Sequence, residues 1–389
     1  MNLHALPSLR LRGKVLLPIV QGGMGVGVSA HQLAGHVARE GAMGTIASVD
    51  LRRLHPDLMA ATGRSRDRAA IEAANLTALA REIGMARAIA DGRGAIAVNV
   101  MRAVSQYADC VRCAGQNGAD AVVMGAGLPL DLPELAADFP DLALIPILSD
   151  ARGVKLLLKK WMRKGRLPDA IVLEHPRFAG GHLGATSPGE MHDARFDFDT
   201  SVPGVHAVFD SLGIAPASIP VICAGGINRP EQIRELIALG ASGVQLGTAF
   251  AVTEEGDAHP LFKRVLAEAQ PEDIVTFMSV AGLPARAVRT PWLEKYLRRE
   301  GKLQQAASAA HKCTLAWDCL VSCGLRDGLA RAGQFCIDNQ LAAALRGDLE
   351  RGLFFRGAER LPFGAAIRPV RELIAYLTGT MPPVEAGAA

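Results

Sequence analysis

The stretches PVICAGGIN (residues 220–228) and GVQLGTAF (residues 243–250) decide the fold that this sequence predicts. Each is a short apolar run that ends in glycine and small polar residues, and a helix-length segment (residues 231–239) lies between them. A continuous apolar run is typical of a parallel strand that is buried on both faces. The two stretches therefore indicate consecutive strands of an α/β protein, with glycine where the backbone approaches a ligand.

Six further apolar runs of the same kind precede this pair. They are VLLPIVQGG (15–23), MGTIAS (43–48), AIAVNV (95–100), AVVMGAG (121–127), LALIPILS (142–149) and AIVLEH (170–175). Helix-length segments separate them, such as residues 31–40. Eight parallel strands with intervening helices over about 250 residues fit a (β/α)₈ TIM barrel better than a doubly wound sheet.

The region after residue 270 lacks this strand pattern. Charged segments such as TPWLEKYLRREGKLQQAASAAHK (residues 290–312) favour helices there. We therefore expect a barrel over residues 1–270 and a mainly helical C-terminal region over residues 271–389. No flexible linker separates the two, so we expect the C-terminal region to dock on the barrel.

Composition and charge limit the classes of function. Of 389 residues, 49% are hydrophobic and 21% charged, which excludes a disordered chain. Lys and Arg number 42 against 39 Asp and Glu, so the basic footprint of a nucleic-acid-binding protein is missing. No apolar run reaches the roughly 20 residues of a membrane helix, and the first residues lack a signal-peptide core. We expect a cytoplasmic protein that acts on a small molecule, without nucleic-acid or membrane partners. The oligomeric state stays open.

The glycines that end the last two strands predict an anion site. Gly225 and Gly226 follow the seventh strand, and Gly247 and Thr248 follow the eighth. In a TIM barrel these two loops lie together at the carboxyl end, where backbone N–H groups free of side chains bind phosphate. The pattern favours a phosphorylated ligand. The alternative is that the glycines only allow tight turns.

Other strand ends supply groups for the rest of such a ligand. The run Gly22-Gly23-Met24-Gly25 offers bare backbone to a flat ring, and Asn99 offers an amide to the same ligand.

His182 lies in the longest loop between strands, residues 176–200, which is a candidate lid. An imidazole there can act as a base near neutral pH or donate a hydrogen bond to a substrate oxygen. Glu174 and His175 lie close by and compete for this role.

In this order the segments resemble the nitronate monooxygenase family, formerly called 2-nitropropane dioxygenases. The family also contains flavin-dependent enoyl-[acyl-carrier-protein] reductases and NADH:quinone reductases. The matching segments are PIVQGGMG (18–25), AVN (97–99), GAGLP (125–129), AGGHLG (179–184), AGGI (224–227) and QLGTAF (245–250). The resemblance implies an FMN-dependent oxidoreductase that oxidises alkyl nitronates. The alternatives are an NAD(P)H-dependent reductase of an enoyl thioester or quinone, and a phosphate-binding barrel without turnover.

Residue by residue, the resemblance implies cofactor contacts and a catalytic histidine. The residues expected at FMN are Gly22, Gly23, Met24, Asn99, Gly125, Gly180, Gly181, Gly225, Gly226, Gln245, Gly247 and Thr248. His182 is expected to face the substrate beside the flavin. The approach to this histidine, Glu174-His175-Pro176-Arg177-Phe178, departs from the shorter family pattern, so the resemblance does not fix the substrate.

Four of the seven cysteines fall in one C-terminal stretch. They are Cys313, Cys319, Cys323 and Cys336, with the spacing C-x5-C-x3-C-x12-C. Four thiolates can hold a [4Fe–4S] cluster or a zinc ion, and the spacing favours iron and sulfur because zinc knuckles pair C-x₂₋₄-C. The C-x3-C-x12-C part is similar to the cluster loop of flavin-dependent dienoyl reductases. The alternative is that the thiols only pack in a helical subdomain.

If the cluster forms, protein purified without oxygen contains iron and acid-labile sulfide in equal amounts, because the cluster holds both in equal number. Colorimetric assays measure the two. Absence of both rejects the cluster, and zinc in their place supports the tetrahedral alternative.

Overall fold

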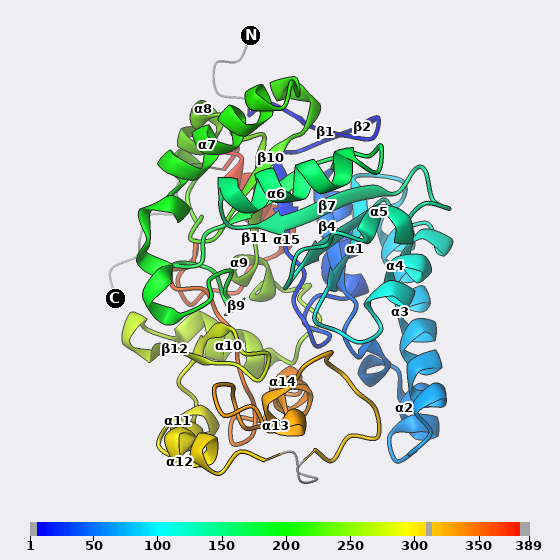
Figure 1. The fold of residues 1–389 in the computed structure, drawn as a ribbon, viewed down its shortest axis with the longest axis vertical. Helices are drawn as coiled ribbons and strands as arrows, with labels where there is room; N and C mark the ends of the chain where they lie inside the picture. The colour runs from blue at the N-terminus through cyan, green and yellow to red at the C-terminus, as the bar shows by residue number, and fades with distance from the viewer. Residues whose placement is uncertain (1–5, 309–312, 382–389) are drawn as a thin grey trace.

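The computed structural model describes residues 6–308 and 313–381, and its centre is a closed barrel of eight parallel strands (Figure 1). The strands are β3 (Ile19–Gln21), β4 (Met43–Ala47), β5 (Ala95–Met101), β6 (Ala121–Gly125), β7 (Ala143–Leu148), β8 (Ile171–Glu174), β10 (Val221–Ala224) and β11 (Gly243–Leu246). Pairing of β11 with β3 closes the ring. The predicted TIM barrel and its eight strands are confirmed.

Helices cover the outside of the barrel. They are α1 (His31–Arg39), α2 (Pro56–Thr62), α3 (Arg68–Ala90), α4 (Tyr107–Gln116), α5 (Leu132–Leu135), α6 (Ala151–Met162), α7 (Phe198–Ser211) and α8 (Pro230–Leu239). The strands are mostly apolar because alternate residues face the helices and the barrel interior. In β8, for example, Leu173 packs in the core under the helices and Val172 in the core inside the barrel.

One predicted strand ends earlier than expected. The stretch GVQLGTAF was expected to be a strand over residues 243–250, but its last residues begin the short helix α9 (Thr248–Ala251). The chain leaves the sheet at Gly247, which is where a phosphate-binding loop after the eighth strand has to turn. Within the described residues, no helix has both the length and the apolar content that crossing a bilayer requires.

An amino-terminal hairpin closes one end of the barrel. β1 (Leu9–Leu11) pairs antiparallel with β2 (Lys14–Leu16), which leads directly into the amino end of β3. Leu9, Leu11 and Leu16 are buried against the inward-facing residues of the barrel strands. This apolar plug leaves the carboxyl ends of the strands as the place for a ligand.

The regular structure of the region after residue 270 is mostly helical, but it also contains a strand pair that the sequence analysis did not predict. β12 (Ile274–Met278) and β13 (Pro284–Val288) form a hairpin, and β13 also pairs with β9 (Gly181–His182). α10 (Pro260–Glu268) precedes this region, whose helices are α11 (Pro291–Leu297), α12 (Glu300–Gln305), α13 (Gly324–Asp327), α14 (Ile337–Leu345) and α15 (Val370–Leu377). Residues 309–312 of the charged segment lie outside the described residues. Figure 1 shows α11 to α14, in yellow and orange, gathered at one end of the barrel.

The last helix returns to the barrel. α15 lies against α1, α8 and α9, and Leu373 and Leu377 are buried in the same core as the barrel helices. The helix directly after β11 is the short α9, which does not cover the barrel as the other helices do. α15 takes the place of an eighth barrel helix. The division of the chain at residue 270 stays a prediction, but the barrel core includes residues far beyond that point.

We expect Leu377→Ala to lower the free energy of unfolding by about 2–5 kcal/mol, because the fully buried side chain leaves a cavity in the barrel core. Urea unfolding followed by circular dichroism measures the change. The control is Leu156→Ala on α6, where the side chain is 46% exposed and the expected change is below about 0.5 kcal/mol. Equal effects of the two variants would show that α15 is not part of the barrel core.

Candidate functional site

A cavity of about 670 Å³ opens at the carboxyl ends of the barrel strands. The twelve expected cofactor contacts and His182 all line it. They are Gly22, Gly23, Met24, Asn99, Gly125, Gly180, Gly181, His182, Gly225, Gly226, Gln245, Gly247 and Thr248. The C-terminal region supplies the rest of the wall through Leu283, Leu320, Ile337, Leu341, Leu353 and Phe355. The structure thus brings the predicted residues together, while the ligand that each contacts stays a prediction.

The loops after β10 and β11 present unpaired backbone donors to this cavity. Gly225 and Gly226 have φ angles of 103° and 76°, a left-handed conformation that glycine adopts without strain. At Gly226 a Cβ would also approach the Cβ of Phe178 to 2.9 Å. The backbone N–H groups of Gly226, Gly247 and Thr248 have no acceptor within the described residues. Such a group of free amides can bind an anion.

The loop after β3 forms a flat wall of the same cavity. A Cβ on Gly23 would lie 2.2 Å from the Cβ of Asn99, so only glycine fits at this close approach. Asn99 donates its Nδ2 to the Val123 carbonyl at 3.3 Å, which leaves its Oδ1 for a ligand. A Cβ on Gly22 would touch the side chain of Gln245 at 3.4 Å. Bare backbone with two amide side chains beside it suits a planar polar ring.

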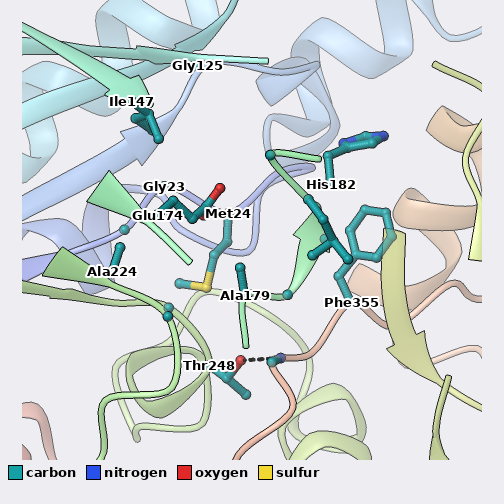
Figure 2. A pocket seen from close by; sticks show the side chains of 18 of the residues that line it. Gly23, Met24, Gly125, Ile147, Glu174, Ala179, His182, Ala224, Thr248 and Phe355 are labelled. Atoms are coloured by element: carbon teal, nitrogen blue, oxygen red, sulfur yellow. Dashed lines mark hydrogen bonds between the residues drawn. The ribbon is translucent and has the colours of Figure 1, made fainter. Parts of the chain in front are cut away.

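A C-terminal segment, residues 355–362, crosses the end of the cavity near Thr248 and is called the strap here. The backbone N–H of Gly357 donates to Thr248 Oγ1 at 3.0 Å, drawn as a dashed line in Figure 2. Gly180 packs against the strap, and a Cβ on it would lie 2.6 Å from the backbone of Arg356 and Gly357. Arg356 is buried and donates to the carbonyls of Leu266, Gly357 and Glu359. Arg356 therefore holds the strap in place, a role that the sequence analysis did not predict.

His182 lies on the opposite wall, and the C-terminal hairpin holds it there. Its Nε2 lies 2.6 Å from Ser279 Oγ in the turn between β12 and β13. Its ring meets the edge of Phe355 at a centroid distance of 5.7 Å (Figure 2). Burial lowers the pKa of His182 to about 4, so the imidazole is neutral at neutral pH. Ser279 was missed in the sequence because the hairpin that carries it was missed.

Ser279 determines which nitrogen of His182 carries the proton. Ser279 is fully buried, and its Oγ already accepts the backbone N–H of Ala281 at 3.1 Å. Among the described residues, His182 Nε2 is the acceptor within reach of the hydroxyl hydrogen. The hydroxyl therefore donates to Nε2, and the proton of the neutral ring is on Nδ1. His182 can offer this N–H to a ligand.

The two residues that compete with His182 differ in their surroundings. His175 is buried away from the cavity, with its Nε2 3.0 Å from Asp197 Oδ1 and its ring against Phe178. Glu174 lines the cavity at the end of β8. Removal from water raises the pKa of its carboxyl group to about 7. Of the two, only Glu174 is placed to meet a ligand.

The four C-terminal cysteines are free thiols in the structure. The pKa of Cys319 is raised, first by burial and then by the negative charge of Asp338 and of the other three cysteines. The four thiols therefore lie within electrostatic range of one another. In residues 6–308 and 313–381, however, no group of three or more His, Cys, Asp or Glu side chains is arranged to hold a metal ion. The cluster stays a prediction.

A buried ionic network joins α14 to the barrel. Arg53, in the loop after β4, lies 2.5 Å from Asp50 and pairs with Asp338 at the start of α14. Burial, followed by the charge of Asp50, raises the pKa of Asp338 to about 7. The C-terminal region is therefore fixed to the barrel on the same side as the cysteines.

The barrel and the glycine-lined cavity define a TIM-barrel protein with a ligand site at the carboxyl ends of its strands. The sequence matches the nitronate monooxygenase family over residues 10–379, and the chain belongs to that family. The resemblance drawn from the sequence is thus confirmed.

Individual relatives share shorter segments or only the fold. A "Probable nitronate monooxygenase" of Bacillus subtilis is 34% identical over 127 residues, which are 33% of this chain and 34% of the relative. One of Staphylococcus aureus is 31% identical over 135 residues, 35% of this chain and 36% of the relative. The chain thus matches about a third of the length of these relatives. FabK of Thermotoga maritima superposes with a TM-score of 0.65 at 24% identity, covering 93% of this chain and 91% of that one. Nitroalkane oxidase of Streptomyces ansochromogenes gives 0.62 at 21% identity, covering 93% and 94%.

The lowered pKa of His182 predicts a loss of stability in acid. Between pH 6.5 and about 4 the unfolded chain binds a proton on this histidine and the folded chain does not, so the free energy of unfolding falls as the pH falls. A pKa displacement of this size corresponds to at most about 3 kcal/mol. Urea unfolding from pH 7.5 to 4.5 should show a smaller acid loss for His182→Asn than for the parent.

The matched control is His192→Asn, since His192 is exposed. This variant should lose stability in acid as the parent does. Identical acid losses in His182→Asn and the parent would contradict the burial of a neutral imidazole.

Proposed function

We propose that this chain binds FMN across the carboxyl face of the barrel and is a flavin-dependent oxidoreductase that oxidises alkyl nitronates. One observation carries the proposal: the unpaired N–H groups after β10 and β11 share a cavity with the bare backbone of residues 22–24. An anion site beside a flat polar wall is what a phosphate linked to a planar ring requires. The cavity volume also lies in the usual range of ligand sites, roughly 300–1,000 Å³.

The residues present fit FMN. The free amides of Gly226, Gly247 and Thr248, with Gly225 beside them, would hold its phosphate, and the Thr248 hydroxyl keeps its hydrogen for a further bond because it accepts from Gly357. The ring would lie against the loop after β3, with the amides of Asn99 and Gln245 beside it. Gly125, Gly180 and Gly181 line the remaining walls. When bound, FMN supplies the redox chemistry.

His182 acts in this proposal as a hydrogen-bond donor. Its low pKa makes it a poor proton acceptor at neutral pH, and Ser279 holds the ring proton on Nδ1. A nitronate is an anion with its charge on the nitro oxygens, so an N–H beside it orients the substrate and stabilises that charge. The substrate is already deprotonated, and no base is needed to form it.

A second candidate function is the NAD(P)H-dependent reduction of an enoyl thioester or quinone. The apolar wall from the C-terminal region favours it. Six large apolar side chains face the cavity, namely Leu283, Leu320, Ile337, Leu341, Leu353 and Phe355. This apolar surface exceeds what a short nitronate covers, and it suits the chain of an acyl thioester. The N–H of His182 would then polarise a thioester carbonyl.

The purified protein should take up FMN and show a flavin absorption spectrum. In anaerobic titrations we expect an alkyl nitronate to bleach the flavin, whereas rapid bleaching by NADH or NADPH would identify the reductase instead. His182→Ala should keep the affinity for FMN but lower turnover about 10²–10³-fold, because it removes one oriented donor. Fluorescence quenching measures FMN binding, and stopped-flow absorbance measures the reduction rate.

Two glycine variants control the binding experiment. Gly226→Ala should abolish FMN binding, since its φ is 76° and the new Cβ meets Phe178. Gly301→Ala on α12 should bind as the parent does, because nothing lies within 4 Å of that Cβ. A parent protein that does not bind FMN would favour the phosphate-binding barrel without turnover. Full turnover in His182→Ala would remove that residue from the reaction.

A further inference from the structure

Glu174 places an unpartnered carboxyl group at the floor of the cavity. It is the last residue of β8, where Ile171 and Leu173 face the helices and Val172 faces the barrel interior. By the alternation of a strand, Glu174 shares the inward face with Val172. Within the described residues its carboxyl oxygens have no hydrogen bond and no ion pair. A side chain placed in this way has to find its partner in a ligand or in water.

The elements packed around Glu174 offer it apolar neighbours. Figure 2 shows it beside Met24, Ile147 and Ala224, from the loop after β3, from β7 and from β10. His182, on the opposite wall, is neutral and bonded to Ser279. The other titratable groups that line the cavity are Asp150, Glu190, Arg195, Cys319, Asp338, Arg356, Glu359 and Arg360. None of these groups shifts the pKa of Glu174, which burial alone raises.

We propose that Glu174 is the proton donor of this cavity: a neutral carboxylic acid that bonds to the ligand on the floor and passes its proton to that ligand. The inference rests on the proposed function, since it takes the cavity to be the place where electrons are exchanged. In the step, the O–H bond of Glu174 breaks and its electron pair stays on the carboxylate. The released proton would go to the bound ligand once that ligand has accepted electrons from the substrate. Water then returns a proton to the carboxylate.

The electrostatics of the two walls support this assignment over His182. Burial shifts the two groups in opposite directions, toward a neutral imidazole and toward a neutral acid. A donor works best when its pKa lies near the working pH, which holds for Glu174 at about 7 and not for His182 at about 4. The proton of His182 is also fixed by Ser279, whereas the proton of Glu174 has no protein partner.

The first test needs no ligand. Between pH 4.5 and 7 the folded chain holds a proton on Glu174 that the unfolded chain has lost, so the parent loses stability as the pH rises through this window. Glu174→Gln keeps the size and stays neutral. We therefore expect the melting temperature of Glu174→Gln, relative to that of the parent, to increase between pH 4.5 and 7.5. Above pH 7.5 this difference should stay constant. Glu268→Gln, at an exposed position of α10, should track the parent. If the melting temperatures of Glu174→Gln and the parent change with pH in parallel, the proposal is overturned.

The second test follows FMN binding against pH by fluorescence. The carboxylic acid donates to an acceptor atom of the ligand and the carboxylate repels it, so the dissociation constant of the parent should rise up to about tenfold per pH unit above pH 7. Glu174→Gln should bind with a constant that does not vary over this range. Tighter binding by the parent at high pH would show that the carboxylate is the binding form, and would overturn the proposal. If the parent does not bind FMN, the proposed function fails, and the melting experiment still decides whether Glu174 is neutral.

The third test addresses the transfer itself. At pH 7, Glu174→Gln should bind FMN as the parent does and turn over about 10²–10⁴-fold more slowly, since an amide cannot give up a proton. His182→Ala should keep the dependence of turnover on a group of pKa near 7, and Glu174→Gln should lose it. Unchanged turnover in Glu174→Gln would sink the transfer step even if the acid proves to be neutral.

Discussion

The pairing of β13 with β9 is the interaction on which the site depends. Through it, a hairpin from the C-terminal region adds to the loop after β8 and sets the direction of His182. The same strand carries Arg286, whose buried guanidinium donates to the carbonyls of Pro176 and Ala179 and so fixes the approach to the histidine. Without these contacts the loop would span residues 175–197 with few bonds to the barrel. The barrel therefore supplies the ligand platform, and the C-terminal region orders the residue that faces it.

The charge distribution of the cavity depends on which of its polar groups are backbone amides and which are side chains. Backbone amides at one end make it attractive to anions, and the guanidinium of Arg356 beside them is occupied by three carbonyls. At the floor and at the opposite wall, burial shifts Glu174 and His182 toward their uncharged forms. Charged side chains, among them Asp150, Arg195 and Glu359, also line the cavity.

The sequence predicted the barrel well and the C-terminal region less well, for a physical reason. Barrel strands are buried on both faces, so they appear as apolar runs, and their glycine-rich ends point directly to the site. The bonds that complete the site join distant segments: His182 to Ser279 over 97 residues, and Thr248 to Gly357 over 109. Neither Ser279 nor Gly357 belongs to a local pattern. The hairpin that carries Ser279 lies outside the barrel pattern, since β12 is only half-buried and pairs antiparallel with β13.

The position of α15 has a consequence for the order in which the molecule assembles. The helix that completes the layer around the barrel is made after every strand and after the segments that hold His182. During synthesis the apolar surface on α1, α8 and α9 stays uncovered until about residue 377 has left the ribosome. The nascent barrel is thus an incomplete shell until α15 has been made, which is later than the segments that hold His182.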